Sequence, residues 1–358
     1  MWLTLMLMET IVMGKHPHLP DNRPETMHKE EIDKAFLTVR GLSVSFPSPY
    51  GESHAVDRVS FDVRRGEILG MVGESGSGKS VTATSILRLV DSPGRITAGN
   101  VGLHGRDLMA LSEREMREIR GGEISMIWQD PMASLNPVKR IGDQLAEAVR
   151  LHWSRVGKGR PTHGKVRRLV VEGLRAVNLQ DPERRIREYP HQLSGGLLQR
   201  VMIAMGLACD PSLLIADEPT TALDVTIQAQ ILDLLRRLQR DRGMSIILIT
   251  HDLGVVAETC DRVQVMYAGR IVERATTRQL FTAPQHPYTI GLLNSMPQGT
   301  TGRGELQAIR GTVPDVREKP SGCSFHPRCD RAWDLCRRVE PPAYMTEAGS
   351  KVRCHLYE

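Results

Sequence analysis

Long apolar runs are missing from this chain of 358 residues. No stretch approaches the ~20 apolar residues that a membrane-spanning helix needs, so no such helix is predicted. The first eight residues are apolar, but no Lys or Arg precedes them and Glu9 follows, which matches a signal peptide poorly. Residues 14–34 are polar and contain prolines, so residues 1–34 are predicted to be a disordered leader. We therefore expect a cytoplasmic protein.

Excess charge is also small. The 47 Lys and Arg residues against 42 Asp and Glu residues leave a net charge of +5. This surplus favours an ordinary solvated surface over a nucleic-acid site, so no nucleic-acid partner is expected, although a membrane-surface partner would also suit it. A composition of 40% apolar and 25% charged residues is typical of a soluble globular protein, and the length allows two domains or one with an appendage.

Cysteine is scarce outside the C-terminal end. Cys209 and Cys260 stand alone and are interpreted as small buried hydrophobic residues. The other four are Cys323, Cys329, Cys336 and Cys354. Their spacing lacks the C-x2-C pairs of structural zinc sites, but clustered cysteines in a cytosolic protein favour a metal over disulfides. Four thiolates from a loop-rich segment can also ligate a [4Fe–4S] cluster. Zinc and no metal remain alternatives, with His326 as a weaker alternative ligand.

Short apolar runs predict the strands of an α/β core. Ile68–Val72 leads into a glycine-rich segment, and Val81–Val90 is predicted to be the helix that follows. Leu213–Ala216 and Ile246–Ile249 are apolar throughout, which is typical of strands buried on both faces of a parallel sheet. Further strands are predicted at Phe36–Arg40, Val59–Val63 and Ile124–Ile127, and a hairpin at Val263–Met266 and Arg270–Glu273.

Helical spacing replaces these runs between about residues 131 and 199. Ile141, Leu145 and Val149 recur at this spacing, which predicts a helical subdomain inserted into the core. A second amphipathic helix is predicted after Asp224. Proline, glycine and cysteine accumulate from about Thr277. The predicted organisation is therefore a main domain at residues 35–275 and a C-terminal extension at residues 276–358.

A phosphate-binding loop follows the run Ile68–Val72. The residues are Gly73, Glu74, Ser75, Gly76, Ser77, Gly78, Lys79 and Ser80. Glycines let successive backbone N–H groups converge on phosphate oxygens at a helix N-terminus. Lys79 is predicted to reach the β- and γ-phosphates, and the Ser80 hydroxyl to bind Mg²⁺. ATP and Mg²⁺ are the expected ligands.

Acidic and polar residues follow the apolar strands. Asp217 and Glu218 end a strand, so their carboxylates are expected at the carboxyl edge of the sheet, where ligands bind. Asp217 is predicted to hold Mg²⁺ through water, and Glu218 to orient and deprotonate the attacking water. His251 follows the next strand and is expected to contact the γ-phosphate. Gln129 follows the strand Ile124–Ile127, where its amide can reach Mg²⁺ or the water.

The segment Leu193-Ser194-Gly195-Gly196 lies between the phosphate-binding loop and Asp217. It resembles the signature of ATP-binding cassette (ABC) ATPases. The resemblance covers about Ala35 to Ala275 and implies a P-loop nucleotide-binding domain with a RecA-like core, a β-subdomain and a helical subdomain. It implies that Ser194, Gly195 and Gly196 meet the γ-phosphate bound by a second ATPase subunit, and that Asp224 lies in a loop crossing that interface. Tyr50 matches the aromatic residue that stacks on adenine, with Phe46 or no ring as alternatives.

Finer matches resemble the peptide importers within this family. They are Trp128–Pro137, Tyr189–Gln192, Thr221–Gln230 and His286–Thr289. The resemblance supports Gln129 as a catalytic residue and associates the four-cysteine extension with an iron–sulfur cluster. It implies two permeases, a second identical or homologous ATPase and an extracytoplasmic solute-binding protein, with this chain at the cytoplasmic face of the inner membrane. Leu197 stands where many relatives have Met, and we expect no loss of function.

Several alternatives remain open. Nickel and glutathione importers share the same features, so the solute is not determined, nor is a homodimer distinguished from a heterodimer. A soluble ABC ATPase acting on nucleic acid or ribosomes usually has two cassettes or a long coiled-coil insertion, and this chain has neither. A redox or sensor protein with incidental nucleotide binding does not explain why Glu218 and His251 are both present.

Overall fold

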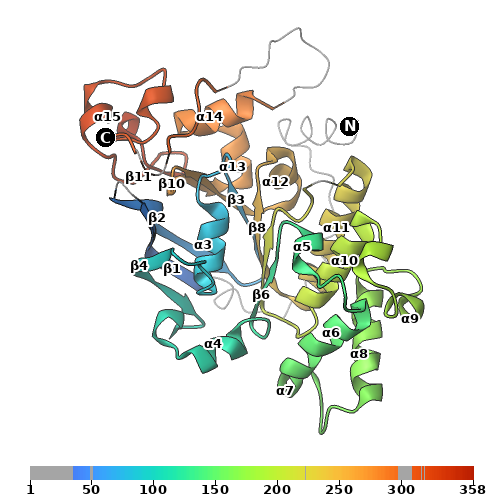
Figure 1. Cartoon of the computed structure of the whole chain (residues 1–358). Coiled ribbons are helices and arrows are strands. Elements are labelled where there is room, and N and C mark those ends of the chain that lie inside the picture. The colour runs from blue at the N-terminus through green and yellow to red at the C-terminus, as the bar shows by residue number, and fades with distance from the viewer. Residues whose placement is uncertain (1–34, 49–50, 222, 297–308, 316, 318) are drawn as a thin grey trace. The chain divides into compact units, whose positions relative to one another are not determined.

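The computed structural model describes residues 35–48, 51–221, 223–296, 309–315, 317 and 319–358 (Figure 1). The predicted leader and Tyr50 lie outside these residues. Contacts divide the chain into two compact units. Unit 1 comprises the chain up to residue 64, residues 68–106 and residues 250–358, and unit 2 comprises residues 65–67 and 107–249. In the described part of the chain, no helix combines the length and apolar content that a bilayer crossing requires.

Unit 1 contains an antiparallel sheet built around β1 (Ala35–Ser48), which pairs with β2 (Gly51–Arg64) on one side and β4 (Arg95–Leu103) on the other. Alternate residues of β2 are buried, as one apolar face of an antiparallel sheet requires. The two predicted strands are therefore parts of longer ones. Strand β4 was not predicted because its first six residues, Arg95–Asn100, include no fully buried side chain and form no apolar run.

A second set of strands in unit 1 runs in the order β11-β12-β10-β9-β3. The pairing of β3 with β9 is parallel, and the other pairings are antiparallel. The predicted hairpin is confirmed, with a turn at Gly269 whose φ of 82° favours glycine. The bounds are Ile68–Val72 (β3), Arg262–Tyr267 (β9), Arg270–Thr276 (β10), Tyr344–Met345 (β11) and Lys351–Val352 (β12).

The helices of unit 1 include one directly after β3 and four near the C-terminus. Helix α3 begins at Lys79, two residues before the predicted start, because Gly78 provides the left-handed turn into it. The C-terminal end of the chain returns to the sheet, since β12 pairs with β10. The bounds are Lys79–Ile86 (α3), Leu253–Thr259 (α12), Thr277–Thr282 (α13), Pro287–Asn294 (α14) and Asp334–Arg338 (α15), with short 3₁₀ turns at His326–Arg328 and His355–Tyr357.

Unit 2 has a parallel core of three strands, β6 (Ile124–Ile127), β7 (Leu213–Asp217) and β8 (Ser245–Thr250). Every residue of β7 and β8 is buried, as their apolar sequences predict. The carboxyl ends of β6 and β7 lie at the same edge, because Ile127 is in register with Ala216. Strand β5 (Arg106–Asp107) lies where the chain passes from unit 1 to unit 2.

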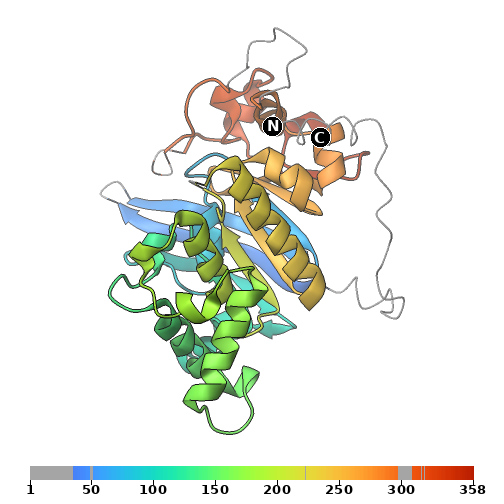
Figure 2. The same cartoon turned by 90° about the vertical axis from the view of Figure 1, so that its right-hand side faces the viewer.

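The segment from residue 131 to 199 is helical, as its spacing predicts, and its helices appear in green in Figure 2. Helices α6 and α8 bury one stripe each; in α6 it is formed by Ile141, Leu145 and Val149 with Ala146. The helices of unit 2 are α4 (Glu113–Ile119), α5 (Pro131–Ser134), α6 (Ile141–Leu151), α7 (Trp153–Val156), α8 (His163–Ala176), α9 (Pro182–Arg185), α10 (Gly195–Gly206) and α11 (Val225–Arg242), with 3₁₀ turns at Leu108–Ala110 and Pro190–Gln192.

Candidate functional site

The glycine-rich loop of unit 1 connects β3 to α3 and is tightly packed. Gly73 has a φ of 152°, and a Cβ atom there would lie 2.2 Å from the carbonyl oxygen of Met266. Gly78 has a φ of 99°, and its Cβ would lie 2.5 Å from the carbonyl oxygen of Ala55. Both contacts are with backbone atoms, which cannot rotate away. Two glycines of the predicted loop are thus required by backbone conformation and by space.

Lys79 lies at the first position of α3 and bridges the loop. Its side chain is buried, and Nζ donates hydrogen bonds to the carbonyl oxygens of Gly73 at 2.8 Å and Glu74 at 3.0 Å. Ser80 is exposed beside it at the helix N-terminus. An ammonium group and unpaired N–H groups at a helix N-terminus together attract anions such as phosphate. The predicted phosphate-binding residues are thus gathered in one loop, with Ser75 and Gly76 exposed and Ser77 buried.

The acidic pair of unit 2 lies at the carboxyl end of β7. Asp217 is its last residue and is 4% exposed, while Glu218 follows with a φ of 46°. A positive φ is uncommon outside glycine and often marks a functional position. The Glu218 N–H donates to the carbonyl oxygen of Ile249 at 2.9 Å, which anchors this turn to β8.

The Glu218 carboxylate is brought together with Gln129, as both were expected at one sheet edge. Gln129 Nε2 donates to Glu218 Oε2 at 3.2 Å, and Thr221 Oγ1 donates to the same oxygen at 2.8 Å. Thr221 was not predicted; a hydroxyl three residues after the acid was the available signal. A carboxylate held by two neutral donors at an accessible edge is an oriented proton acceptor. The general-base role of Glu218 and the water or Mg²⁺ contact of Gln129 stay predictions.

The signature residues of unit 2 begin helix α10. Ser194 is the residue before the helix, and both Ser194 and Gly195 are exposed. A Cβ atom on Gly196 would lie 2.9 Å from Ile227 Cγ2, so this glycine allows close packing against the start of α11. Asp224 caps α11 by accepting a hydrogen bond from the Ile227 N–H at 2.9 Å. The two predicted interface segments therefore start neighbouring helices within one unit.

His251 belongs to unit 1 and directly follows β8. Its side chain is exposed. The hydroxyl of the preceding Thr250 accepts a hydrogen bond from the Asp252 N–H at 3.0 Å, and Asp252 in turn caps α12. The turn that carries His251 is therefore ordered by its neighbours. Its predicted contact with the γ-phosphate stays a prediction, as does the adenine-stacking role of Tyr50, which lies outside the described residues.

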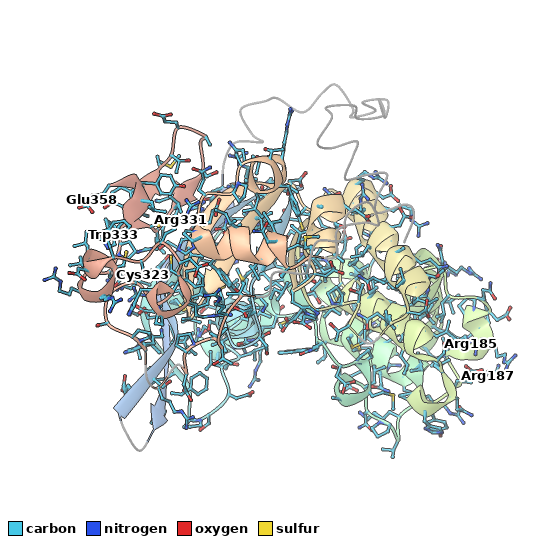
Figure 3. All side chains as sticks on the ribbon, turned by 90° about the horizontal axis from the view of Figure 1, so that it is seen from above. Arg185, Arg187, Cys323, Arg331, Trp333 and Glu358 are labelled. Carbon is cyan, nitrogen blue, oxygen red and sulfur yellow. The ribbon has the colours of Figure 1, made fainter. Side chains whose placement is uncertain are left out.

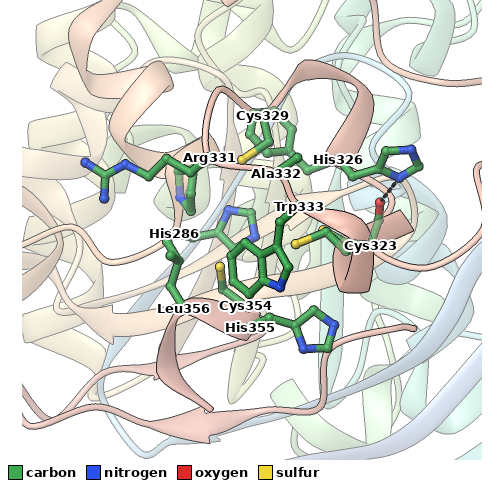
Figure 4. A pocket seen from close by; sticks show the side chains of 13 residues that line it. His286, Cys323, His326, Cys329, Arg331, Ala332, Trp333, Cys354, His355 and Leu356 are labelled. Carbon is green, nitrogen blue, oxygen red and sulfur yellow. Dashed lines mark hydrogen bonds between the residues drawn. The ribbon is translucent and has the colours of Figure 1, made fainter. Parts of the chain in front are cut away.

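The four C-terminal cysteines line one pocket in unit 1. Cys323 lies near Arg331, Trp333 and Glu358 in the C-terminal extension (Figure 3). Figure 4 shows the sulfur atoms of Cys323, Cys329 and Cys354 pointing toward the middle of the pocket, and Cys336 also lines it. The His326 side chain contacts its own segment, since its Nδ1 lies 2.9 Å from the Cys323 carbonyl oxygen (Figure 4).

Burial, together with the charges of the other three cysteines, raises the pKa of Cys323 to about 11. Burial also raises the pKa of Cys329 and of Cys354. Among the described residues, no group of three or more His, Cys, Asp or Glu side chains is arranged to hold a metal ion. The pocket therefore gathers the predicted ligands without the arrangement of a single-ion site.

The other two cysteines are buried, as interpreted from the sequence. Cys209 is 3% exposed, and burial raises its pKa to about 11. Cys260 lies against β3, since a Cβ atom on Gly70 would be 2.9 Å from its sulfur. Both act as small core side chains.

Comparison with known proteins identifies the family. Residues 56–221 match the family model described as "ABC transporter", and residues 272–336 match "Oligopeptide/dipeptide transporter, C-terminal region". The chain is 51% identical over 322 residues to the "Dipeptide transport ATP-binding protein DppD" of Haemophilus influenzae, covering 90% of this chain and 95% of that protein. The chain belongs to the ABC transporter ATP-binding proteins of the dipeptide/oligopeptide importer type. It is an ATPase coupled to transport.

Other relatives agree on family and fold. The "Oligopeptide transport ATP-binding protein OppD" of Salmonella typhimurium is 49% identical over 305 residues, covering 85% of this chain and 89% of that protein. The solved structure "Dimeric Structure of MJ0796, a Bacterial ABC Transporter Cassette" has a TM-score of 0.60 and 26% identity, covering 67% of this chain and 98% of that chain. The predicted P-loop ABC-type fold is thus confirmed. The C-terminal family match ends at residue 336, so Cys354 lies beyond it.

Proposed function

We propose that this ATPase energises the uptake of di- and oligopeptides from the cytoplasmic face of the cell membrane. The observation that carries the proposal is its identity of 51% over 90% of the chain with a dipeptide transport ATP-binding protein, together with the C-terminal match to oligopeptide/dipeptide transporters. As an ABC importer ATPase it acts with permease subunits and as a dimer. The full complex contains two permeases, a second identical or homologous ATPase, and an extracytoplasmic solute-binding protein.

Hydrolysis follows from positioning and charge. Phosphoryl transfer requires little covalent participation of the protein, so aligned donors and cations supply most of the rate. Lys79 and the loop N–H groups hold the β- and γ-phosphates, while Ser80, Asp217 and Gln129 hold Mg²⁺ or its water. Glu218 accepts the proton of the attacking water, and His251 contacts the γ-phosphate. The hydrogen bonds from Gln129 and Thr221 to Glu218 support this assignment, because they fix the orientation of the carboxylate.

Two copies share each nucleotide. Ser194, Gly195 and Gly196 of one subunit contact the γ-phosphate held by the phosphate loop of the other, and Asp224 lies at that interface. The exposure of Ser194 and Gly195 at the start of a twelve-residue helix supports this proposal, since exposed N–H groups there are available to an anion. Hydrolysis then requires closure of the dimer, and closure drives the permeases.

Purification from native membranes tests the complex. A tagged full-length chain is isolated in mild detergent, and the co-purifying proteins are identified by mass spectrometry. We expect two permeases, with or without a second ATPase. Recovery only with ribosomes or nucleic acid would favour a soluble ABC ATPase and contradict the importer.

Uptake measurements test the solute. Cells lacking this chain should lose uptake of a labelled dipeptide, and the wild-type gene should restore it, whereas a Lys79→Ala variant should not. If dipeptide uptake stays normal and uptake of nickel or of glutathione is lost, the lost solute is the substrate and peptide is not. ATPase activity of the purified complex is measured in parallel, so that a loss of transport is separated from a loss of expression.

We also propose that the cysteine pocket holds a [4Fe–4S] cluster. Four cysteines that line one pocket match in number the thiolate ligands of such a cluster. His286 also lines the pocket and is 1% exposed; its Nδ1 accepts the Tyr288 N–H at 3.0 Å, so Nε2 carries the proton. When bound, the cluster joins the four cysteines and can exchange one electron.

Iron content tests this second proposal. Protein purified without oxygen should contain about four iron atoms per chain and absorb visible light as Fe–S clusters do. Cys329→Ser should lower the iron content, whereas Cys209→Ser, a buried cysteine of unit 2, should not. Zinc in place of iron would support the single-ion alternative. Absence of both metals from the parent would contradict any metal assignment.

A further inference from the structure

Glu74, the second residue of the phosphate loop, is held from two sides by the C-terminal extension. Its backbone N–H donates to the Tyr288 hydroxyl at 2.9 Å. Its carboxylate accepts two hydrogen bonds from Arg328, from Nη1 to Oε2 at 2.7 Å and from Nη2 to Oε1 at 3.0 Å. All three residues belong to unit 1. These contacts fix both the backbone and the side chain of one loop residue.

Arg328 is fixed in turn by the residues around it. Its side chain is 4% exposed. Nε donates to the carbonyl oxygen of Arg310 at 2.8 Å, Nη2 to that of Gly311 at 3.3 Å, and the guanidinium lies 5.8 Å from the ring centroid of Tyr267. A planar fork with this many partners has one orientation, and its bidentate bond to a carboxylate is geometrically demanding. Arg328 therefore moves only with the segment that carries it.

That segment, residues 323–329, begins and ends with two of the pocket cysteines. It also carries Phe325, whose ring centroid lies 5.4 Å from that of Tyr288 and 5.2 Å from that of Tyr267. Tyr288 is fully buried in this aromatic group. A displacement of the cysteine segment thus disturbs Arg328 directly and Tyr288 through Phe325. Both contacts with Glu74 depend on how this segment is folded.

We propose that Arg328 and Tyr288 are positioning residues for nucleotide binding, through which the cysteine segment controls the affinity of the phosphate loop for ATP. The inference rests on the phosphate loop as the ATP site. Lys79 Nζ donates to the Glu74 carbonyl oxygen at 3.0 Å, so a shift of Glu74 shifts the ammonium that binds phosphate. The C-terminal extension thereby affects the affinity of the phosphate loop for ATP.

Equilibrium binding of MgATP to the full-length chain, measured by calorimetry, tests the proposal. Arg328→Gln should weaken binding by about tenfold, because a charge-assisted pair is lost from the loop. Tyr288→Phe should weaken it less, since one neutral hydrogen bond is removed. Arg337→Gln is the matched control, because Arg337 lies in the same extension with an exposed side chain. Its affinity should equal that of the parent.

Further measurements separate positioning from general stability. In ATPase assays Arg328→Gln should raise KM while kcat at saturating ATP is retained, and Arg328→Lys should restore part of the affinity through its charge. Cys329→Ser should also weaken ATP binding, and combining it with Arg328→Gln should add little, because both act through one link. ATP affinity of folded Arg328→Gln within about twofold of the parent would overturn the proposal.

If Arg328→Gln does not fold, Glu74→Gln tests the same ion pair from its other partner. Glu74 is partly exposed, so this change keeps the shape of the loop and removes only the charge pair. It should weaken binding as Arg328→Gln does, and unchanged affinity would contradict the link. Lys79→Ala serves as the reference for a lost phosphate site. If the parent itself fails to bind ATP, the proposed ATPase function fails, and this result differs from an unaffected Arg328→Gln variant.

Discussion

Two helices of this protein begin at glycine-containing turns, and the turns differ in what surrounds them. At the start of α3, Gly73 and Gly78 have positive φ angles and touch backbone carbonyls, and Lys79 is buried. At the start of α10, Gly195 is exposed, and a Cβ atom there would meet only Leu223 Cδ2 at 3.7 Å, an ordinary contact. The first turn needs its glycines to fold. The second has no such need at Gly195 in the described chain.

The two turns therefore differ in whether other residues of this chain surround them. The phosphate loop is shaped by residues of its own unit, including the two contacts on Glu74. The signature turn presents an open helix start, where the proposed function expects the nucleotide held by the second subunit.

The largest expected effect is at Glu218, the proposed general base of unit 2. Glu218→Gln should lower ATP turnover by about 10²–10⁴-fold, because the general base is lost while the shape is kept. MgATP binding should persist, since the phosphate loop is untouched. Turnover by the assembled transporter is measured, with the exposed Glu118→Gln as the control. Undiminished turnover would remove Glu218 as the base.

Gly73→Ala should abolish detectable ATP binding and lower thermal stability. The added methyl group meets the Met266 carbonyl oxygen at 2.2 Å, and relief of this contact must move the loop. Strain of this kind costs about 1–3 kcal/mol. Calorimetric binding and thermal unfolding of the same sample measure both effects. A stable variant with normal affinity would show that the loop is not shaped by this packing.

Gly195→Ala should reduce ATP turnover while leaving the melting temperature and the ATP affinity of the single chain unchanged. The methyl group has room in the chain but lies where the partner's nucleotide is expected. Gly173→Ala is the control, because a Cβ there meets nothing within 4 Å. If Gly195→Ala destabilises the isolated chain, the contrast between the two turns is wrong.

The smallest effect concerns the ion pairs that join the strands of unit 1. Burial raises the pKa of Asp62, but the hydrogen bond from Arg274 and the charges of Arg262 and Arg274 outweigh it and hold the pKa below 3.8. Because the folded-state pKa is depressed, this stabilisation is present above pH ~4 and is lost as the pH falls through the folded-state value.

Asp62→Asn should therefore lower the melting temperature at pH 7 by about 2–4 °C. The difference from the parent should shrink as the pH falls below about 4, where the parent's carboxylate becomes protonated. Thermal unfolding between pH 3 and 7 measures this, with the exposed Asp233→Asn as the control. A difference that does not depend on pH would assign the effect to packing.

Much of the nucleotide site could be predicted because its residues are contiguous. The phosphate loop and the acidic strand end each follow an apolar strand, so local pattern located them, and the signature turn was located by its resemblance to a family motif. The strands β3, β6, β7 and β8 were predicted to within one residue at each end, because buried parallel strands have apolar sequences. Strand β4 was missed because most of it is exposed.

The sequence by itself determined which segments are the candidates for ATP binding, because phosphate binding requires fixed spacing along a loop and helix start. Only the tertiary structure decided what lies against those segments. Arg328 meets Glu74 across 254 positions of sequence, and Thr221 meets Glu218 through the shape of a turn. No periodicity encodes such contacts, because they depend on how separate elements pack. The contact between the cysteine-containing extension and the phosphate loop is therefore a property of the tertiary structure.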